Sequence, residues 1–322
     1  MNPAPQKQGS RRFDTPMDWR THLEGAVRGA TLRDAPLAPR TAVRVGGPAD
    51  LLVRPADPDD LAAVLRAARE LGVPVFPLGG GANLLVSDAG VRGVVVKLPP
   101  GFGEERIHST RLVLSAGAPS SRLVAWAQKL GLVGCEFAAA IPGTLGGLVA
   151  MNAGTRAGEM KDVVRRVELA TAGGAGWLDA AALEFAYRTC RLPPGAVVTR
   201  LELELREGDV AASRAAMEAD VARRRATQPL DRPTFGSTFR NPPGEFAGRL
   251  IEAVGLKGHR VGGAAWSNVH ANFIVNLGGA AARDVLDLIG LARGRVRERF
   301  GIELEPEVRL VGDFPDRGAS DT

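Results

Sequence analysis

The apolar residues in the first part of the chain follow two periods, which predict strands alternating with a helix. Asp57-Pro58 has the form of a helix N-cap followed by proline at the first helical position, and Gly72 has the form of a helix end. Apolar side chains recur at helical spacing between these signals, at Leu61, Val64, Leu65, Ala68 and Leu71. Neighbouring apolar runs predict strands at Ala49–Val53, Val73–Leu78 and Val94–Leu98.

Residues 101–206 again combine strands with a helix. Ser120 or Ser121 is the expected N-cap of a helix with one apolar face, and Gly131 ends it. Strands are predicted at Leu112–Ala116 and Val197–Arg206, the second with leucines alternating with charged residues.

Residues 207–313 have longer helical patterns. Helices are predicted at Val210–Thr227, Glu245–Val254 and Ala282–Phe300, and strands at Phe273–Leu277 and Ile302–Leu310. In the last strand the apolar residues share one face, and Glu307 shares the other with Glu303, Glu305 and Arg309. Glu307 is therefore expected outside the core, facing solvent or a polar cleft.

These patterns divide the chain into three segments and two tails. The expected domains are residues 23–100, 101–206 and 207–313. Residues 1–22 are polar and Pro-rich without an apolar signal core, so they are interpreted as a flexible N-terminal tail, and 314–322 as a C-terminal tail.

The composition is that of a soluble globular protein, with 45% hydrophobic and 24% charged residues among 322. A net charge of +5, from 41 basic and 36 acidic residues, suits an anionic small molecule and is too diffuse for nucleic acid. The densest basic run, Arg223-Arg224-Arg225, is interpreted as a solvated helix face.

Cysteine usage and hydropathy bear on the compartment. Cys135 and Cys190 have no CxxC partner, and the four histidines are scattered, so neither a metal site nor a disulfide framework is expected. No apolar run has the length of a membrane span, so a cytoplasmic protein without membrane insertion is expected.

A glycine-rich loop, Gly79–Asp88, directly follows a predicted strand. Its amides could cradle a phosphate or pyrophosphate. The loop is neither a dinucleotide-binding fingerprint nor a P-loop, because its glycines are consecutive and no Gly-Lys-Ser/Thr ends it. A glycine-rich hairpin turn is the alternative.

Two more glycine-rich stretches, Ile141–Gly147 and Met151–Gly154, lie close together. They predict backbone packed against a flat ligand, and tight helix–strand packing is the alternative.

The stretch Phe235–Pro242 places the hydroxyl of Ser237 on a glycine turn between two phenylalanines. Such a hydroxyl can face a ligand in a water-poor setting, with Arg240 and Asn241 able to bind an anion or a polar group. Alternatively, the stretch is a turn leading into a strand.

Taken in order, these motifs resemble the UDP-N-acetylenolpyruvoylglucosamine reductase family, the flavin enzymes of peptidoglycan precursor synthesis. The resemblance covers roughly residues 40–312 and is more specific than any single motif. The motifs are Arg44-Val-Gly-Gly47, Gly79–Asp88, Ile141–Gly147, Met151–Gly154, Tyr187-Arg188, Gly236-Ser237 and Glu307-Val-Arg309.

The resemblance implies an α+β fold, with a two-part FAD-binding domain of the vanillyl-alcohol-oxidase (PCMH) type followed by an α+β substrate-binding domain. It implies noncovalent FAD, NADPH as co-substrate, and reduction of the UDP-sugar UDP-N-acetylglucosamine enolpyruvate to UDP-N-acetylmuramate. Tyr187 is the only tyrosine, which matches the shorter subtype without the extra tyrosine loop.

The resemblance also implies roles for individual residues. Arg188, Ser237 and Glu307 occupy the catalytic positions. Substrate contacts are implied for Tyr187, Gln228, Arg240 and Asn241, with arginine at 240 where lysine is commoner. Cofactor contacts are implied for Arg44, Gly79, Gly80, Gly81, Ala82, Asn83, Leu84, Ser87, Gly143, Thr144, Gly146, Gly147, Asn152 and Gly154.

The chain departs from the family pattern at Thr155-Arg156-Ala157, which replaces a stretch often rich in glycine. Two other functions remain open. An oxidase of the same flavin fold often attaches FAD through His or Cys, and the glycine loops offer neither. A non-catalytic UDP-sugar sensor would tolerate loss of Arg188, Ser237 and Glu307, yet all three are present.

Overall fold

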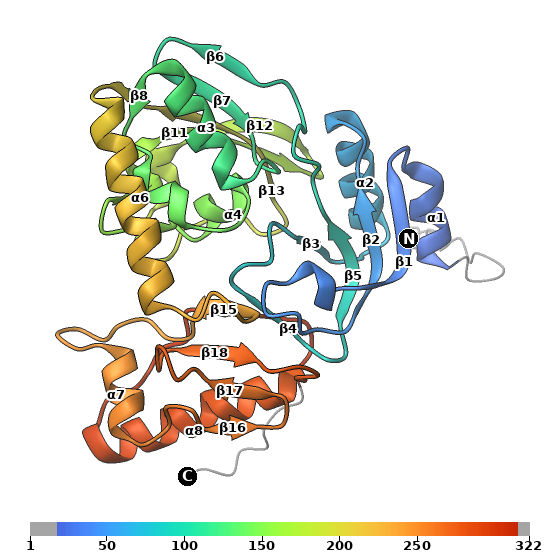
Figure 1. Cartoon of the computed structure of the whole chain (residues 1–322). Helices are drawn as coiled ribbons and strands as arrows, with labels where there is room; N and C mark the ends of the chain where they lie inside the picture. The colour runs from blue at the N-terminus through green and yellow to red at the C-terminus, as the bar shows by residue number, and fades with distance from the viewer. Residues whose placement is uncertain (1–17, 315–322) are drawn as a thin grey trace, which may run out of the picture.

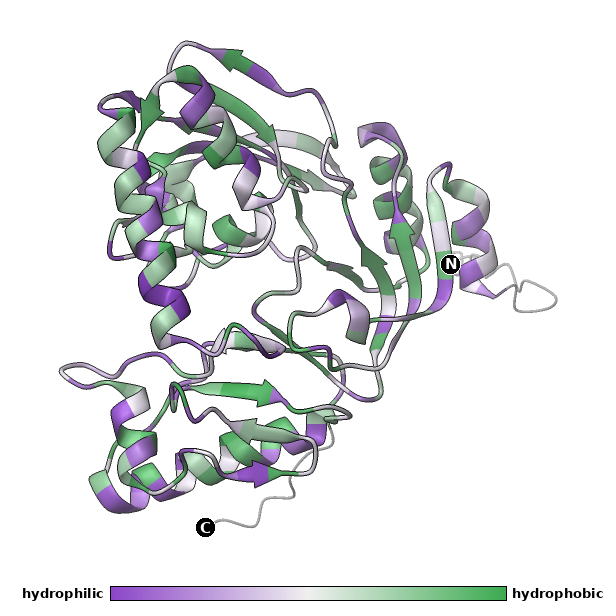
Figure 2. Cartoon of the chain, in the orientation of Figure 1, coloured by the Kyte–Doolittle hydropathy of each residue, from purple (hydrophilic) through white to green (hydrophobic). Residues whose placement is uncertain are grey.

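The computed structural model describes residues 18–314, which form three lobes (Figure 1). The N-terminal lobe lies at the right of the figure, the second lobe at the top and the C-terminal lobe at the bottom. In Figure 2 the strands of each lobe are mostly green, and the helices carry purple on their outer sides, as expected for sheets covered by amphipathic helices.

The N-terminal lobe is a four-stranded sheet in the order β1-β2-β5-β3, antiparallel only between β1 and β2. Asp57 caps α2 by accepting a hydrogen bond from the amide of Asp60, and the buried face of α2 packs in the core with β2 and β5. The elements are α1 (Trp19–Ala26), β1 (Ala30–Pro36), η1 (Ala38–Arg40), β2 (Pro48–Arg54), α2 (Pro58–Glu70), β3 (Val75–Pro77), β4 (Leu84–Val86) and β5 (Val91–Val96).

The second lobe is an antiparallel five-stranded sheet in the order β12-β11-β13-β7-β6. Helices α3 and α4 contribute Leu123, Leu145 and Leu148 to the core beneath it. The elements are β6 (Arg106–His108), β7 (Arg111–Ser115), α3 (Ser120–Leu130), β8 (Leu132–Val133), η2 (Glu136–Ala140), α4 (Leu145–Ala150), β9 (Gly154–Thr155), β10 (Gly158–Glu159), α5 (Met160–Val163), β11 (Val164–Thr171), β12 (Gly174–Asp179), η3 (Ala180–Leu183) and β13 (Val197–Glu204).

The C-terminal lobe is an antiparallel sheet in the order β15-β18-β17-β16, with α7 and α8 packed on it. The long helix α6 runs from the second lobe down to this lobe along the left edge of Figure 1. The elements from residue 206 onward are β14 (Arg206–Glu207), which pairs with β8 of the second lobe, α6 (Val210–Thr227), β15 (Thr234–Ser237), α7 (Ala247–Ala253), β16 (Arg260–Val261), β17 (Ala264–Trp266), β18 (Phe273–Asn276), α8 (Ala282–Phe300) and β19 (Arg309–Val311).

Strand pairing and packing join the first and third lobes. The last strand, β19, pairs in parallel with β4 of the N-terminal lobe, with Leu310 opposite Leu85. Val43, Val45 and Leu85 from the N-terminal lobe are buried in the core of the C-terminal lobe. The chain therefore returns at its end to the glycine-rich loop that precedes β4.

Several sequence expectations need correction. The N-terminal tail does not reach residue 22, because α1 begins at Trp19 and buries Leu23, whereas residues 1–17 lie outside the described part. The strand expected at Ile302–Leu310 is confined to β19, and Leu310 is 48% exposed. Pro119 rather than either serine caps α3.

The helices expected at Val210–Thr227 and Ala282–Phe300 are confirmed at both ends. The helix expected at Glu245–Val254 is shorter, since α7 spans Ala247–Ala253. The remaining domain boundaries stay predictions. Within residues 18–314 no helix has both the length and the apolar character needed to cross a membrane.

Candidate active site

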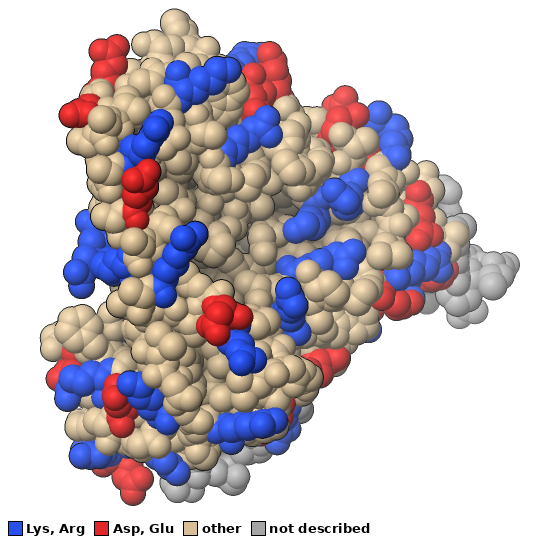
Figure 3. Space-filling view, in the orientation of Figure 1, with Lys and Arg blue, Asp and Glu red and all other residues tan. Residues whose placement is uncertain are grey.

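A cavity of about 1410 Å³ opens where the three lobes meet. Residues from every lobe line it, including Gly80, Thr144, Arg188, Ser237 and Glu307. Figure 3 shows the hollow in the middle of this face, with Lys and Arg side chains around it. Its volume exceeds the roughly 300–1,000 Å³ typical of a pocket for one drug-sized ligand, so a cofactor and a second ligand fit together.

The predicted cofactor loop contacts the second glycine-rich loop directly. A Cβ on Gly80 would lie 2.6 Å from the Cα of Gly143, and one on Gly81 would lie 2.2 Å from the carbonyl oxygen of Arg40. Gly81 also has a φ of +67°, a left-handed conformation that glycine adopts without strain. Only glycine therefore permits this approach of the two backbones.

The amides of this loop are free to bind a ligand. Those of Gly79 to Asn83 donate to no other described residue. By contrast, the amides of Leu145 and Gly146 in α4 donate to Ala118 and Ala116 at 2.8 and 2.9 Å. Backbone donors left without a protein acceptor next to a cavity favour an anionic ligand, and among the described residues the amides of Gly143 and Thr144 in the second loop have no acceptor either.

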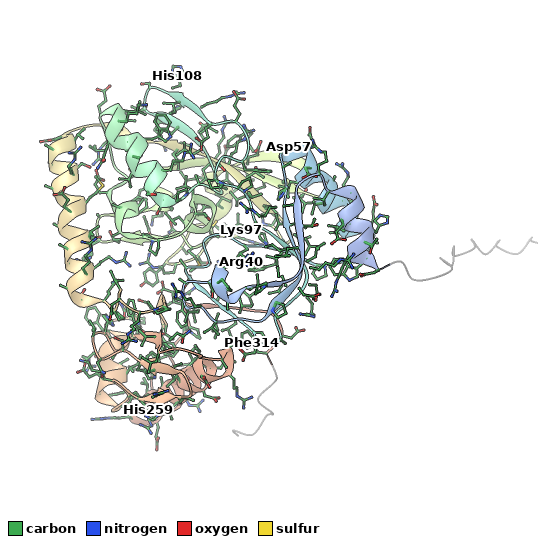
Figure 4. The ribbon with its side chains drawn as sticks, turned by 45° about the vertical axis from the view of Figure 1, so that its right-hand side comes forward. Arg40, Asp57, Lys97, His108, His259 and Phe314 are labelled. Carbon is green, nitrogen blue, oxygen red and sulfur yellow. The ribbon has the colours of Figure 1, made fainter. Side chains whose placement is uncertain are left out.

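Sequence reasoning missed Lys97, which follows β5 and contacts the cofactor loop without lining the cavity. Its Nζ donates to the carbonyl oxygen of Gly79 at 2.7 Å. Burial, with smaller effects from Arg40 and Arg54, lowers the pKa of Lys97 below its ordinary value. Figure 4 labels Lys97 and Arg40 between the upper and lower lobes. The available signal was a cation directly after an apolar strand.

The charged residues that line the cavity are seven arginines and a single carboxylate, Glu307. The orphaned amides, the glycine cradle and this excess of cations fit the pyrophosphate of FAD, with charge to spare for a second anionic ligand. The arginines are Arg156, Arg188, Arg223, Arg224, Arg225, Arg232 and Arg309.

The run Arg223-Arg224-Arg225 is therefore more than the solvated helix face expected from the sequence, because all three residues line the cavity. Arg224 is partly buried, donating to the carbonyl oxygen of Ala140 and to Gln228 Oε1. Burial is the main cause that lowers its pKa.

Arg188 and Glu307 form an ion pair at the cavity wall, with 3.3 Å between Nε and Oε1. Their side chains are 24% and 16% exposed, so both remain within reach of a ligand. The Arg188 guanidinium also lies 5.3 Å from the ring centre of Tyr187. Glu307 is thus at a polar cleft, one of the two places expected from the sequence.

The pKa of Glu307 lies above its ordinary value. Burial of the carboxylate is the main cause, and the nearby Arg188 and Arg240 oppose it only in part. Its backbone is fixed, because its amide donates to Thr238 at 2.8 Å and its carbonyl oxygen accepts from Asn83 Nδ2 at 3.0 Å.

Ser237 ends β15, opposite Phe273 of β18, and is partly buried. The preceding Gly236 has a φ of +86°, which supplies the turn expected from the sequence. Ser237 lines both the large cavity and an adjoining cavity of about 440 Å³. The bond from Glu307 to Thr238 ties the serine strand to the Arg188–Glu307 pair.

The four expected substrate residues are divided by the structure. Gln228 and Asn241 line the cavity, whereas Tyr187 and Arg240 are absent from its wall. Asn241 Oδ1 accepts from the amide of Ala247 at 3.1 Å, and Arg240 lies 3.5 Å from Glu305. Tyr187 is 53% exposed.

Three of the expected cofactor residues lie outside the cavity wall. Arg44 is exposed, Ser87 Oγ donates to the carbonyl oxygen of Asp313, and Asn152 is fully buried. The others line the wall: Gly79, Gly80, Gly81, Ala82, Asn83, Leu84, Gly143, Thr144, Gly146, Gly147 and Gly154.

The two cysteines are buried and unpaired, and neither lines the cavity. Burial raises the pKa of Cys135 to about 12 and that of Cys190 to about 11. Such thiols are poor nucleophiles, which disfavours the covalent-flavin oxidase alternative. Within the described residues no cluster of three His, Cys, Asp or Glu could hold a metal ion.

Comparison with known proteins matches the two parts of this site to two family models. Residues 49–176 match the FAD binding domain, and residues 228–311 match the C-terminal domain of UDP-N-acetylenolpyruvoylglucosamine reductase. The glycine cradle belongs to the first part, and Ser237 and Glu307 to the second.

Whole-chain relatives agree. A UDP-N-acetylenolpyruvoylglucosamine reductase of Anaeromyxobacter sp. (strain Fw109-5) is 72% identical over 95% of this chain and 96% of its own. That of Myxococcus xanthus (strain DK1622) is 56% identical over 87% of this chain and 91% of its own. The crystal structure of the Thermus caldophilus reductase aligns with a TM-score of 0.75 at 40% identity, covering 88% of this chain and 99% of that one.

Fold and site together define an FAD-dependent oxidoreductase, with a PCMH-type flavin domain followed by a separate substrate domain. Within that class, the chain belongs to the UDP-N-acetylenolpyruvoylglucosamine reductase family, whose reaction serves peptidoglycan precursor synthesis. Its 322 residues fit the shorter type.

Proposed function

We propose that Arg188, Ser237 and Glu307 carry the reduction of UDP-N-acetylglucosamine enolpyruvate to UDP-N-acetylmuramate, with NADPH as reductant. The observation that supports this most strongly is the Arg188–Glu307 pair, which shares one cavity wall with Ser237 and the glycine cradle. When held by the glycine cradle, FAD would supply the redox chemistry that moves a hydride from NADPH to the terminal carbon of the enolpyruvyl group.

Arg188 stabilises the charge that this transfer creates. When hydride reaches the terminal carbon, negative charge develops on the neighbouring carbon and spreads into the carboxylate. A guanidinium can hold that carboxylate through two hydrogen bonds, and it does so more strongly as the charge grows. The 24% exposure of Arg188 leaves it available to the substrate.

Ser237 supplies the proton that completes the reduction. Its hydroxyl can donate to the carbon next to the substrate carboxylate, and the alkoxide then takes a proton back from water. A serine is a weak acid, so the arginines around the cavity are needed to stabilise that alkoxide. Glu307, whose pKa is raised by burial, polarises the enol ether or orients the proton path.

Substrate affinity rests on the cations and amides near the catalytic pair. Gln228 and Asn241 line the cavity and offer amide donors to the diphosphate or the sugar. The excess of arginine provides the field that attracts a nucleotide sugar carrying a diphosphate and a carboxylate.

Replacing Ser237 with alanine tests the proposal, because it separates the two half-reactions. In stopped flow, flavin reduction by NADPH should be unchanged, since that step needs no proton from Ser237. Oxidation of the reduced enzyme by the enolpyruvyl substrate should slow by about 10²–10⁴-fold or more. Ser237→Cys should retain part of the activity. Equal slowing of both half-reactions would indicate a structural role, and an unchanged oxidative half would remove Ser237 from the mechanism.

A further inference from the structure

Asn152 is an unusual residue for a cofactor contact, because its whole side chain is already engaged. It is fully buried and its Nδ2 donates to Ala186 O at 3.1 Å and to Glu159 Oε2 at 3.0 Å. Its Oδ1 accepts from the amide of Lys161 at 3.0 Å. These bonds use both donors and engage the oxygen of the amide, so its side chain serves the protein rather than a ligand.

The carbonyl that Asn152 holds belongs to the loop that presents Arg188. Arg188 and Glu184 have φ values of +56° and +43°, in the left-handed region that costs a non-glycine residue energy. Ala186 lies between them and exchanges hydrogen bonds with Thr189 at 3.1 Å in both directions. A loop in this conformation needs outside support, and Asn152 provides it at its midpoint.

Asn83 makes the corresponding contact to the other half of the pair. Its Nδ2 donates to the carbonyl oxygen of Glu307 at 3.0 Å, and its own carbonyl oxygen accepts from the amide of Arg309 at 3.1 Å. Asn83 therefore bonds the backbone on both sides of Val308 and fixes the backbone position from which the Glu307 side chain extends.

We propose that Asn83 and Asn152 are positioning residues that hold Glu307 and Arg188 in register with the cofactor cradle. Each asparagine stands in a glycine-rich loop, Gly79–Asp88 or Met151–Gly154, and each bonds a backbone carbonyl of the segment that carries one member of the pair. The same two loops therefore form the cofactor cradle and hold the backbone segments that carry the ion pair. This inference rests on the proposed function of the pair.

Three substitutions test this proposal. Asn152→Gly keeps the left-handed backbone, where Asn152 has a φ of +39°, and removes only the side chain. Asn152→Asp keeps the shape, loses both donors and places a carboxylate against that of Glu159. Asn83→Ala loses the bond to Glu307. The two Asn152 variants should retain FAD affinity, measured by titration of apoprotein, and once loaded with FAD all three variants should retain flavin reduction by NADPH. Oxidation of the reduced enzyme by the enolpyruvyl substrate should slow about 10- to 100-fold, as expected when catalytic groups are misplaced by about 1 Å.

The pH profile of the oxidative half-reaction distinguishes positioning from general support. Glu307 faces two cations, Arg188 and Arg240, and Arg240 is itself paired with Glu305. When Asn152 no longer holds Arg188, its attraction for the carboxylate weakens and the pKa of Glu307 rises further. The limb of the profile that reports Glu307 should therefore move to higher pH in Asn152→Gly. An unshifted limb would overturn the proposal.

A double-mutant cycle asks whether Asn152 acts through Arg188. In an Arg188→Ala background, adding Asn152→Gly should cost little more, because the group that it positions is gone. A full, additive loss would show that Asn152 acts elsewhere and would overturn its half of the proposal.

Asp60→Asn is the matched control for Asn152→Asp, because it exchanges the same two side chains in the opposite direction. Asp60 is buried and accepts hydrogen bonds from backbone amides. It lies in α2, and no residue of α2 lines the cavity. Asp60→Asn should lower Tm while leaving the pH profile unchanged. Ser237→Ala is run in parallel. If it slows the oxidative half and the asparagine variants do not, the positioning proposal alone fails. If Ser237→Ala also has no effect, the proposed function fails.

Discussion

The buried carboxylate of Asp60 and the partly buried carboxylate of Glu307 have pKa values shifted in opposite directions. Asp60 in α2 is 1% exposed and accepts hydrogen bonds from the amides of Ala56, Arg28 and Gly29 at 2.8, 2.8 and 2.9 Å. Burial alone would raise its pKa, but the three amides outweigh it and the pKa lies below its ordinary value.

Glu307 is less completely buried, with 16% of its side chain exposed, and has different surroundings. Its carboxylate lies 3.3 Å from an arginine, and within the described residues no backbone amide donates to it. The effect of burial therefore prevails, and the pKa of Glu307 is raised. One carboxylate is therefore committed to holding a turn together. The other keeps unused hydrogen-bonding capacity and a higher affinity for a proton, which is typical of a group at a reactive site.

The largest effect is expected from removing the charge of Glu307. Glu307→Gln should lower kcat by about 10²–10⁴-fold, the range typical of acid–base and polarising groups. Its Tm at neutral pH should be equal to or above that of the wild type, since a poorly solvated carboxylate is removed. Steady-state kinetics and a thermal melt measure the two quantities. A variant with normal kcat would place Glu307 with the structural carboxylates.

Asp60→Ala should give the reverse result. It leaves three amides without their acceptor, at about 1–3 kcal/mol each before water compensates, so a loss of about 3 kcal/mol in unfolding free energy is expected. The kcat of the folded variant should match the wild type, because α2 contributes nothing to the cavity wall. Urea unfolding and kinetics on the same sample check both. Lost activity with unchanged stability would contradict this assignment.

The sequence could predict regular structure wherever local signals decide it. Both α6 and α8 begin and end as expected, the first after Asp209, whose side chain caps it, and the second before Gly301 in a left-handed conformation. The strand expected at Ile302–Leu310 is wrong because its alternation is not matched by a partner strand. Within that stretch only Pro306, Arg309 and Leu310 pair with another strand or bridge, and Leu310 is 48% exposed.

The site was predictable in its motifs but not in its contacts. The neighbouring residues could not show that Ser120 does not cap α3. Its hydroxyl instead donates to the carbonyl oxygen of Ile141, 21 positions away, at 2.6 Å. Lys97 and Asn152 escaped correct interpretation for the same reason. Their partners, Gly79 and Ala186, lie 18 and 34 positions away in the sequence, and only the fold brings them together.

The pH dependence of stability should separate the two carboxylates by sign. Glu307 has a folded pKa above its unfolded value, so its contribution is fully present below the ordinary carboxyl pKa of about 4 and is lost as pH rises through the raised value. Asp60 has a lowered pKa, so its contribution is present above about pH 4 and is lost as pH falls through the lowered value.

Melts of Glu307→Gln and Asp60→Asn against wild type over a pH series measure this difference. The Tm of Glu307→Gln relative to wild type should rise with pH, whereas the deficit of Asp60→Asn should shrink as the pH becomes acidic. If the Tm differences of both variants from wild type changed with pH in the same direction, the two carboxylates would not differ electrostatically as described.

The smallest effect is expected at Arg240, the second cation that acts on Glu307. Its pair with Glu305 is long, at 3.5 Å, and the partner is 72% exposed, so the pair contributes at most about 1 kcal/mol. The Nε of Arg240 is buried and has no partner among the described residues, a cost that lysine would avoid. Arg240→Lys keeps the positive charge, so kcat should change by less than about threefold and Tm should be equal or slightly higher.

Arg240→Met removes the charge, and the limb of the pH–rate profile that reports Glu307 should then move to higher pH while the Arg188 ion pair is retained. If Arg240→Lys instead abolished activity, a bidentate contact of this guanidinium with the substrate would be required, and burial and Arg188 would no longer suffice to explain how Glu307 is prepared for catalysis.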